Sequence, residues 1–216
     1  MFKKKVFIVE DHPVVVKGLM QVINKQDELE VVGHSNNSRD AMSAIVSSNP
    51  DIVTVDLSLK NSSGLELIKE VKAVCPNLKI LVISMFDDKM YAERSIAAGA
   101  NGFVNKEKVT KELILAIMTI LNGKNYLSRD TAVELAVRSN RDSKGDCGYT
   151  GLLSDRELEV FELIGEGLTT IEIAERIDLG IKTIETYKNK IKEKLDIKNF
   201  TQLIKKAVEW RMINKK

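Results

Sequence analysis

The sequence contains little cysteine, few aromatic residues and no long apolar run. Its two cysteines, Cys75 and Cys147, form no CxxC pattern and have no histidine at metal-ligand spacing. We therefore expect free thiols in the reducing environment of the cytoplasm. No apolar run approaches the roughly 18 residues of a membrane span, and the run at 6–9 is too short for a signal-peptide core. We expect a cytoplasmic protein without a membrane segment.

An excess of charge of one sign is also missing, because 33 basic residues face 31 acidic ones, for a net charge of +2. This balance excludes a uniformly basic nucleic-acid coat but permits a local basic face. Hydrophobic residues make up 44% of the chain and charged residues 30%, so the chain can bury a core. Its 216 residues suffice for one large domain or two small ones.

Short β-branched runs alternate with longer amphipathic stretches in the first part of the chain. The runs predict strands at 6–9, 30–34, 52–55, 80–83 and 102–104. The amphipathic stretches predict helices at about 14–24, 38–48, 65–74, 89–98 and 111–122. Five strands alternating with five helices predict an α/β domain with a doubly wound parallel sheet, which we assign to residues 1–123.

The rest of the chain keeps a helical period and shows no strand pattern. A polar linker with one short helix is expected over 124–151. Ser154 with Glu157, and Thr169 with Glu172, have the spacing of capping boxes, so helices should begin directly after Ser154 and Thr169. Two further helices are expected at about 181–195 and 200–210, which gives an all-α, four-helix domain over 152–216.

Polar side chains follow the predicted strands of the first domain. Glu10 and Asp11 come after the first strand, Asp56 after the third, Ser84 after the fourth and Lys106 just past the fifth. In an open α/β sheet the carboxyl ends of the strands share one edge, where ligands bind. Three carboxylates there need a cation, and oxygen ligands suit Mg²⁺. With a hydroxyl and an ammonium opposite, the set predicts phosphoryl transfer onto a carboxylate, with Asp56 as nucleophile.

The sequence around these residues resembles the receiver domain of bacterial two-component response regulators. The resemblance covers residues 5–122 and rests on the segments VEDHP, DLSLKNSSGLE, LVISMFDD and GFVNK. It implies a (βα)5 flavodoxin-like fold with strand order 2-1-3-4-5, and phosphorylation by a sensor histidine kinase or a phosphotransfer protein. The implied roles are phosphoacceptor for Asp56, Mg²⁺ binding for Glu10, Asp11, Asp56 and the Ser58 backbone carbonyl, and phosphate binding and switching for Ser84, Phe103 and Lys106.

Two positions depart from the family pattern. Lys60 replaces the usual proline in the loop after the phosphoacceptor, and Glu10 replaces the first of two aspartates. Because Glu10 remains a carboxylate, we still expect metal binding. The domain is expected to catalyse only its own Mg²⁺-dependent phosphorylation and dephosphorylation, so it is not an enzyme with a separate substrate.

Charge is unevenly distributed in the second domain. Residues 154–180 carry 2 basic and 8 acidic residues, whereas residues 181–216 carry 11 basic and 4 acidic ones. The resulting counts of −6 and +7 place a positive field on the last two helices, as expected for contact with phosphates. A short helix, a break at Gly180 and a helix at 181–195 with one apolar and one polar face predict a helix-turn-helix.

Residues 153–209 resemble the DNA-binding domain of NarL/FixJ (LuxR-type) regulators. The resemblance rests on the segment LSDRELEVFELIGEGLTTIEIAERIDLGIKTIETYKNKIKEKL. It implies binding to promoter DNA, a homodimer and contact with RNA polymerase. Three positions depart from the pattern of that family: Gly180 replaces the usual serine, Tyr187 replaces a frequent histidine, and Glu185 replaces a residue that is often basic. The predicted DNA contacts are Glu185, Thr186 and Asn189 at base edges, Lys188 and Lys192 at the DNA backbone, Lys190 at phosphate or solvent, and Lys182 and Thr183 at the start of the helix.

Together these features predict a response regulator whose phosphorylation at Asp56 controls sequence-specific DNA binding and transcription. Two alternatives stay open. One is a transcription regulator that does not depend on phosphorylation and is controlled by a protein partner. The other is an aspartyl-phosphate hydrolase, although such enzymes usually carry a second aspartate two residues after the nucleophile, where this chain has Ser58.

Overall fold

A computed structural model of the chain describes residues 2–59, 63–85, 88–128, 132 and 152–214. It divides into two compact units, residues 1–140 and 141–216, and each is considered by itself. The short helix predicted within the linker and Cys147 lie outside the described residues, apart from one helical position at Ala132.

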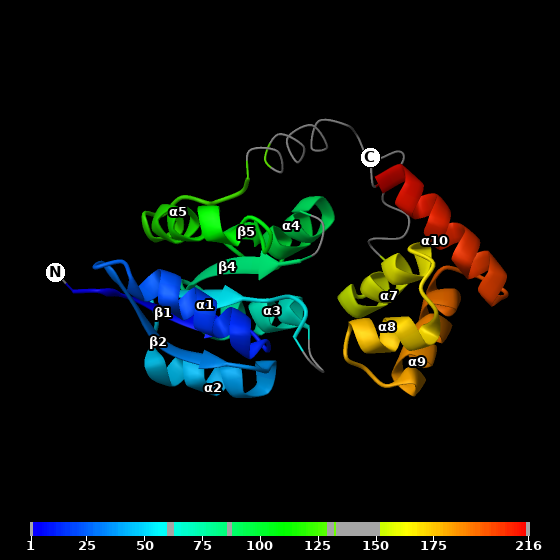
Figure 1. The fold of residues 1–216 in the computed structure, drawn as a ribbon, viewed down its shortest axis with the longest axis horizontal. Coiled ribbons are helices and arrows are strands. Elements are labelled where there is room, and N and C mark those ends of the chain that lie inside the picture. The colour runs from blue at the N-terminus through cyan, green and yellow to red at the C-terminus, as the bar shows by residue number, and fades with distance from the viewer. Residues whose placement is uncertain (1, 60–62, 86–87, 129–131, 133–151, 215–216) are drawn as a thin grey trace. The chain divides into compact units, whose positions relative to one another are not determined.

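The first unit contains a five-stranded parallel sheet, as predicted (Figure 1). Its spatial order is β2-β1-β3-β4-β5, the order that the sequence resemblance implied. The strands are β1 (Lys4–Val9), β2 (Leu29–Ser35), β3 (Ile52–Val55), β4 (Lys79–Ser84) and β5 (Gly102–Asn105). Central strand β3 is buried at every position, which explains its unbroken run of apolar and β-branched residues.

Helices cover both faces of the sheet. They are α1 (Pro13–Asn24), α2 (Ser38–Ser48), α3 (Gly64–Val74), α4 (Asp88–Ala97) and α5 (Val109–Leu121). Helices α1 and α5 contact each other and close one face, where Ile23 and Ile117 join Ile8, Leu81 and Val104 in a single apolar core. Helices α2, α3 and α4 contact one another in sequence along the opposite face.

The residues after α5 return to the edge of β5. The Phe103 amide donates to the Tyr126 carbonyl at 3.0 Å, and the Tyr126 amide donates to the Asn101 carbonyl at 3.0 Å. The Tyr126 hydroxyl lies 3.2 Å from Glu112 on α5, and burial together with this carboxylate raises the pKa of Tyr126 to about 12. Gly102 permits the approach, because a Cβ there would lie 2.7 Å from the Tyr126 carbonyl oxygen.

The second unit consists of helices in its described part, namely α7 (Asp155–Gly165), α8 (Thr170–Arg176), α9 (Ile181–Lys194) and α10 (Phe200–Asn214). Both predicted capping boxes are present, with Ser154 opening α7 and Thr169 opening α8. Helix α7 packs on α9 and α10, and α8 packs on α9. The rings of Phe161 and Trp210 meet edge to face at 5.9 Å. None of the described helices is long and apolar enough to cross a membrane.

Candidate phosphorylation site and DNA-binding face

The carboxylates predicted at the strand ends lie together. Glu10 and Asp11 follow β1, and Asp56 follows β3. Glu10 and Asp56 are each 2% exposed. One carboxylate oxygen from each of the three acids and one ring nitrogen of His12 all lie within 4.8 Å of one another. His12 was not assigned a role from sequence. Its Nδ1 lies 3.0 Å from Glu10 Oε1 and 2.8 Å from Asp11 Oδ1.

Lys106 brings a positive charge into this cluster from the end of β5. Its Nζ lies 2.7 Å from Glu10 Oε2 and 2.8 Å from Asp56 Oδ2. Burial disfavours the charged form of Lys106, but the Asp56 and Glu10 carboxylates outweigh burial and raise the pKa of Lys106. Burial raises the pKa of Asp56, which the Lys106 ammonium only partly offsets. The ammonium therefore occupies the place where a cation is required between two buried acids.

The other predicted receiver residues lie just after β3 (Ser58), at the end of β4 (Ser84) and within β5 (Phe103). The Ser58 amide donates to Asp56 Oδ1 at 3.3 Å. Ser84, at the end of β4, is fully buried, and its carbonyl accepts from the Lys106 amide at 2.8 Å. Phe103 is 2% exposed. Because Val104 joins the core on the α1 and α5 side, alternation along the strand turns Phe103 to the face where α4 contacts β5.

Gly64 is a residue of this site to which the sequence analysis gave no role. It is the first residue of α3, directly after the capping residue Ser63. A Cβ at Gly64 would lie 2.2 Å from the Asp56 carbonyl oxygen and 2.6 Å from Leu57 Cα. Only glycine therefore lets the start of α3 approach Asp56 so closely. The glycine after two serines was the available sequence signal.

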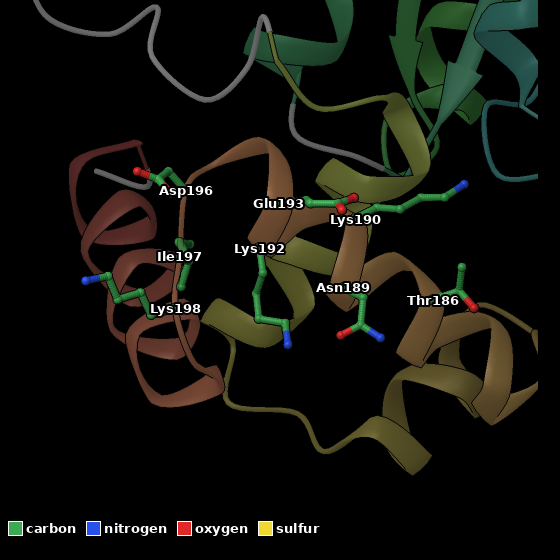
Figure 2. Close-up of a pocket in the computed structure, with 8 residues that line it drawn as sticks. All are labelled: Thr186, Asn189, Lys190, Lys192, Glu193, Asp196, Ile197 and Lys198. Atoms are coloured by element: carbon green, nitrogen blue, oxygen red, sulfur yellow. The ribbon is translucent and has the colours of Figure 1, made fainter.

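The second unit presents a polar face along α9. Lys182, Thr183, Glu185, Thr186, Asn189 and Lys190 are all exposed. Gly180, where the sequence predicted a break, caps the helix without a side-chain hydrogen bond. A groove of about 560 Å³ runs along the later part of α9 and the turn toward α10. Figure 2 shows Asn189 and Lys192 pointing to one side of this groove while Lys190 extends away from them.

Lys188 does not lie where the sequence analysis placed it. Its residue exposure is only 7%, and its Nζ contacts Thr170 and Glu185 instead of projecting as a DNA-backbone contact. The predicted backbone role for Lys188 therefore disagrees with the structure. The reason is periodicity: position 188 falls on the same stripe of α9 as Ile184 and Ile191, which are fully buried. That spacing was the signal for a buried lysine.

The end of α9 is tied to the start of α7. Lys194 Nζ lies 2.6 Å from Glu157 Oε2, and the same oxygen accepts from the Ser154 amide at 2.7 Å. Burial opposes the charge of Glu157, but these hydrogen bonds outweigh burial and lower the pKa of Glu157. One carboxylate thus completes the capping box of α7 and fixes the C-terminal end of α9.

A buried acidic cluster at the carboxyl edge of a parallel sheet, followed along the chain by a helix-turn-helix with a polar face, is typical of a receiver domain joined to a DNA-binding domain. Comparison with known families agrees with this class. Residues 6–118 match the response regulator receiver domain, and residues 151–207 match the bacterial regulatory proteins of the luxR family. The chain belongs to the two-component response regulators with a LuxR-type DNA-binding domain.

Three relatives resemble this chain, two of them over nearly its full length. The oxygen regulatory protein NreC of Staphylococcus aureus (strain NCTC 8325 / PS 47) is 32% identical over 97% of this chain and 99% of its own length. A LuxR-family response regulator from Aurantimonas sp. SI85-9A1 is 29% identical, with a TM-score of 0.61 over 64% of this chain and 99% of its own. RcsB from Salmonella enterica serovar Typhimurium, bound to a promoter in the presence of phosphomimetic BeF₃⁻, is 26% identical, with a TM-score of 0.59 over 96% of this chain and 98% of its own.

Proposed function

We propose that Asp56 is the phosphoacceptor of this response regulator and that a sensor histidine kinase or a phosphotransfer protein supplies the phosphoryl group. The observation that carries the proposal is the Lys106 ammonium held between Glu10 and Asp56, 2.7 and 2.8 Å from their oxygens. The carboxylate of Asp56 attacks the phosphorus, and the bond from phosphorus to the donor breaks. Lys106 then holds the new charge.

Magnesium suits the donor set at this edge. Carboxylates of Glu10, Asp11 and Asp56 and the backbone carbonyl of Ser58 are hard oxygen ligands, and Mg²⁺ binds through few carboxylates together with phosphate oxygens. When bound, Mg²⁺ neutralises charge on the transferring phosphoryl group. In this proposal Glu10 acts through a water molecule, while Asp11 and Asp56 are direct ligands.

The switch in this proposal follows from the charge that phosphorylation adds. A phosphoryl group brings about −1.5 to −2 charges and three acceptor oxygens. Ser84 and Lys106 are the hydroxyl and the ammonium at neighbouring strand ends that can bind those oxygens. Lys106 already lies 2.8 Å from Asp56, so in this proposal the Ser84 hydroxyl moves toward the phosphoryl group and Phe103 fills the space that it leaves. The change then reaches the DNA-binding domain. Domain limits of 1–123 and 152–216, joined by a linker over 124–151, belong to the same proposal.

In the second domain, α9 enters the major groove of promoter DNA. Its 14 residues span roughly 21 Å at about 1.5 Å per residue, enough to lie in one groove. Glu185, Thr186 and Asn189 face base edges, and Lys182, Thr183, Lys190 and Lys192 lie toward phosphates. A homodimer on DNA, contact with RNA polymerase and a cytoplasmic location complete the proposal.

Acetyl phosphate tests the phosphoacceptor. In the presence of Mg²⁺, intact-mass measurement should show one added phosphoryl group on the wild-type protein and none on Asp56→Asn. Removing Mg²⁺ with EDTA should abolish labelling of the wild type. Equal labelling of the two proteins would place the phosphoacceptor elsewhere, and a wild type that is never labelled would favour a regulator independent of phosphorylation.

A further inference from the structure

A closed polar triangle lies beneath the exposed face of α9. Lys188 Nζ is 2.6 Å from Glu185 Oε1 and 2.9 Å from Thr170 Oγ1. The Thr170 hydroxyl in turn lies 3.0 Å from the same Glu185 oxygen. The ammonium also lies 4.0 Å from the centroid of the Phe200 ring, within the range of a cation–π contact. Thr170 begins α8 and Phe200 begins α10. The triangle therefore connects α8 with α9, and the ring contact of Lys188 adds α10.

The two charged members of the triangle differ in exposure. The Lys188 side chain is 8% exposed, whereas the Glu185 side chain is 49% exposed. The ammonium directs its donors at Glu185 and Thr170 and its remaining side at an aromatic face, so a DNA phosphate could reach it only if this arrangement broke. The carboxylate, in contrast, is both held in place and open to solvent.

The two oxygens of Glu185 have different roles. Oε1 takes part in both contacts of the triangle, and within the described residues no contact to Oε2 is found. The hydrogen bond from Lys188 lowers the pKa of Glu185 more than burial raises it, and Thr170 lowers it further. Oε2 is thus an oriented acceptor on the face of α9. The Lys188 charge also compensates the repulsion that a lone carboxylate would meet from DNA phosphates.

We propose that Lys188 is a positioning residue that holds Glu185 as the acceptor for a cytosine amino group in the major groove, rather than a contact to the DNA backbone. A carboxylate accepting from cytosine N4 is the matching chemistry among base edges. The inference rests on the proposed role of α9 in reading DNA. It adds a specificity for cytosine at one base pair and makes that specificity depend on a residue that does not touch DNA.

The first test is base preference. Full-length protein treated with acetyl phosphate and Mg²⁺ is used to select binding sites from random DNA, as wild type, Glu185→Gln and Lys188→Met. Methionine keeps the packing of the lysine stem. Both variants should lose the preference for cytosine at the same base pair by about 5- to 100-fold, the range of one good base contact. Lys192→Ala, the matched control, should keep that preference.

The second test is salt dependence. The double variant Glu185→Gln/Lys188→Met has the same formal charge as the wild type, so long-range charge effects cancel. Its slope of log affinity against log salt should equal that of the wild type, whereas Lys192→Ala should flatten the slope by about 0.9. The cytosine preference of the double variant should be no lower than that of Glu185→Gln alone, because both changes disrupt the same Lys188–Glu185 pair.

Two results together would overturn the proposal and assign Lys188 to a contact with the DNA backbone. The first is a slope of log affinity against log salt that is flatter by about 0.9 in the double variant, and the second is a cytosine preference that persists in Lys188→Met. Thr170→Val removes a second corner of the triangle and should relax the same base pair, which keeps the test valid if Lys188→Met does not fold. A wild-type protein that selects no sequence while Lys192→Ala binds as well as wild type would refute the reading role of α9 itself.

Discussion

Replacing Lys106 by methionine should destabilise the first unit in the absence of Mg²⁺. The change leaves Glu10 and Asp56 facing each other without the ammonium that now lies 2.7 and 2.8 Å from them. Removing one member of a buried ion pair generally costs about 3–5 kcal/mol. Lys106 retains 11% side-chain exposure and methionine restores the packing of its stem, so we expect a loss of about 2–3 kcal/mol in the free energy of unfolding.

The assay is urea unfolding in EDTA, followed by hydrogen exchange of amides in β3 and β4. The protein has one tryptophan, Trp210 in α10, so its fluorescence reports the second unit and should show an unchanged midpoint in the variant. Mg²⁺ at about 100 times the dissociation constant of the wild type should raise the free energy of unfolding of the wild type by about 2.7 kcal/mol. The variant is measured at the same Mg²⁺ concentration. The variant should gain at least as much as the wild type, because no ammonium competes for the carboxylates.

Two results would refute this reasoning. Identical unfolding of β3 and β4 in EDTA would mean that the two short contacts of Lys106 add no net stability. A gain from Mg²⁺ that is smaller in the variant than in the wild type would mean that metal and ammonium do not share the same carboxylates.

Two further predictions concern single residues. Glu157→Gln should lower the stability of the second unit by about 1–2 kcal/mol at pH 7, as expected for lost hydrogen bonds to a charge. The pKa of Glu157 in the folded protein lies below its ordinary value of 4.5. The difference in stability between variant and wild type should therefore be present above pH 4.5 and vanish as the pH falls through that lower pKa. Unfolding followed by Trp210 fluorescence at a series of acidic pH values measures this difference. Gly64→Ala should destabilise the first unit by about 1–3 kcal/mol through overpacking and slow phosphorylation of Asp56 by acetyl phosphate; labelling at the wild-type rate would show that the chain relaxes around the added methyl group.

The sequence predicted the elements well where local signals act alone. The strand at 52–55 has the predicted bounds, and both capping boxes begin their helices at the predicted residues. The acidic cluster was also predictable, because parallel strands bring their carboxyl ends to one edge and each acidic residue directly follows a strand. These features depend on spacing along the chain and on one topological rule.

The features that the sequence did not reveal depend on contacts between distant residues. Lys188 was predicted to lie at the DNA backbone from its charge and its place in the helical period. Its partners Thr170 and Phe200 lie 18 and 12 positions away and are brought to it only by packing of three helices. The need for glycine at position 64 arises from the carbonyl of Asp56, eight positions earlier and directly after β3. None of these three partners can be identified from periodicity.

The hydrogen bonds between Tyr126 and the β5 edge also bear on solubility. An exposed edge strand offers unpaired amides and carbonyls to a strand of another chain, and proteins counter this by covering or distorting their edges. At one end of the sheet the Tyr126 backbone takes up these groups beside Phe103. At the other end the pairing of β1 with β2 shifts register between Val6 and Phe7, so that Val32 is passed over. One edge is thus capped and the other is irregular, and self-association through strand addition is disfavoured at both.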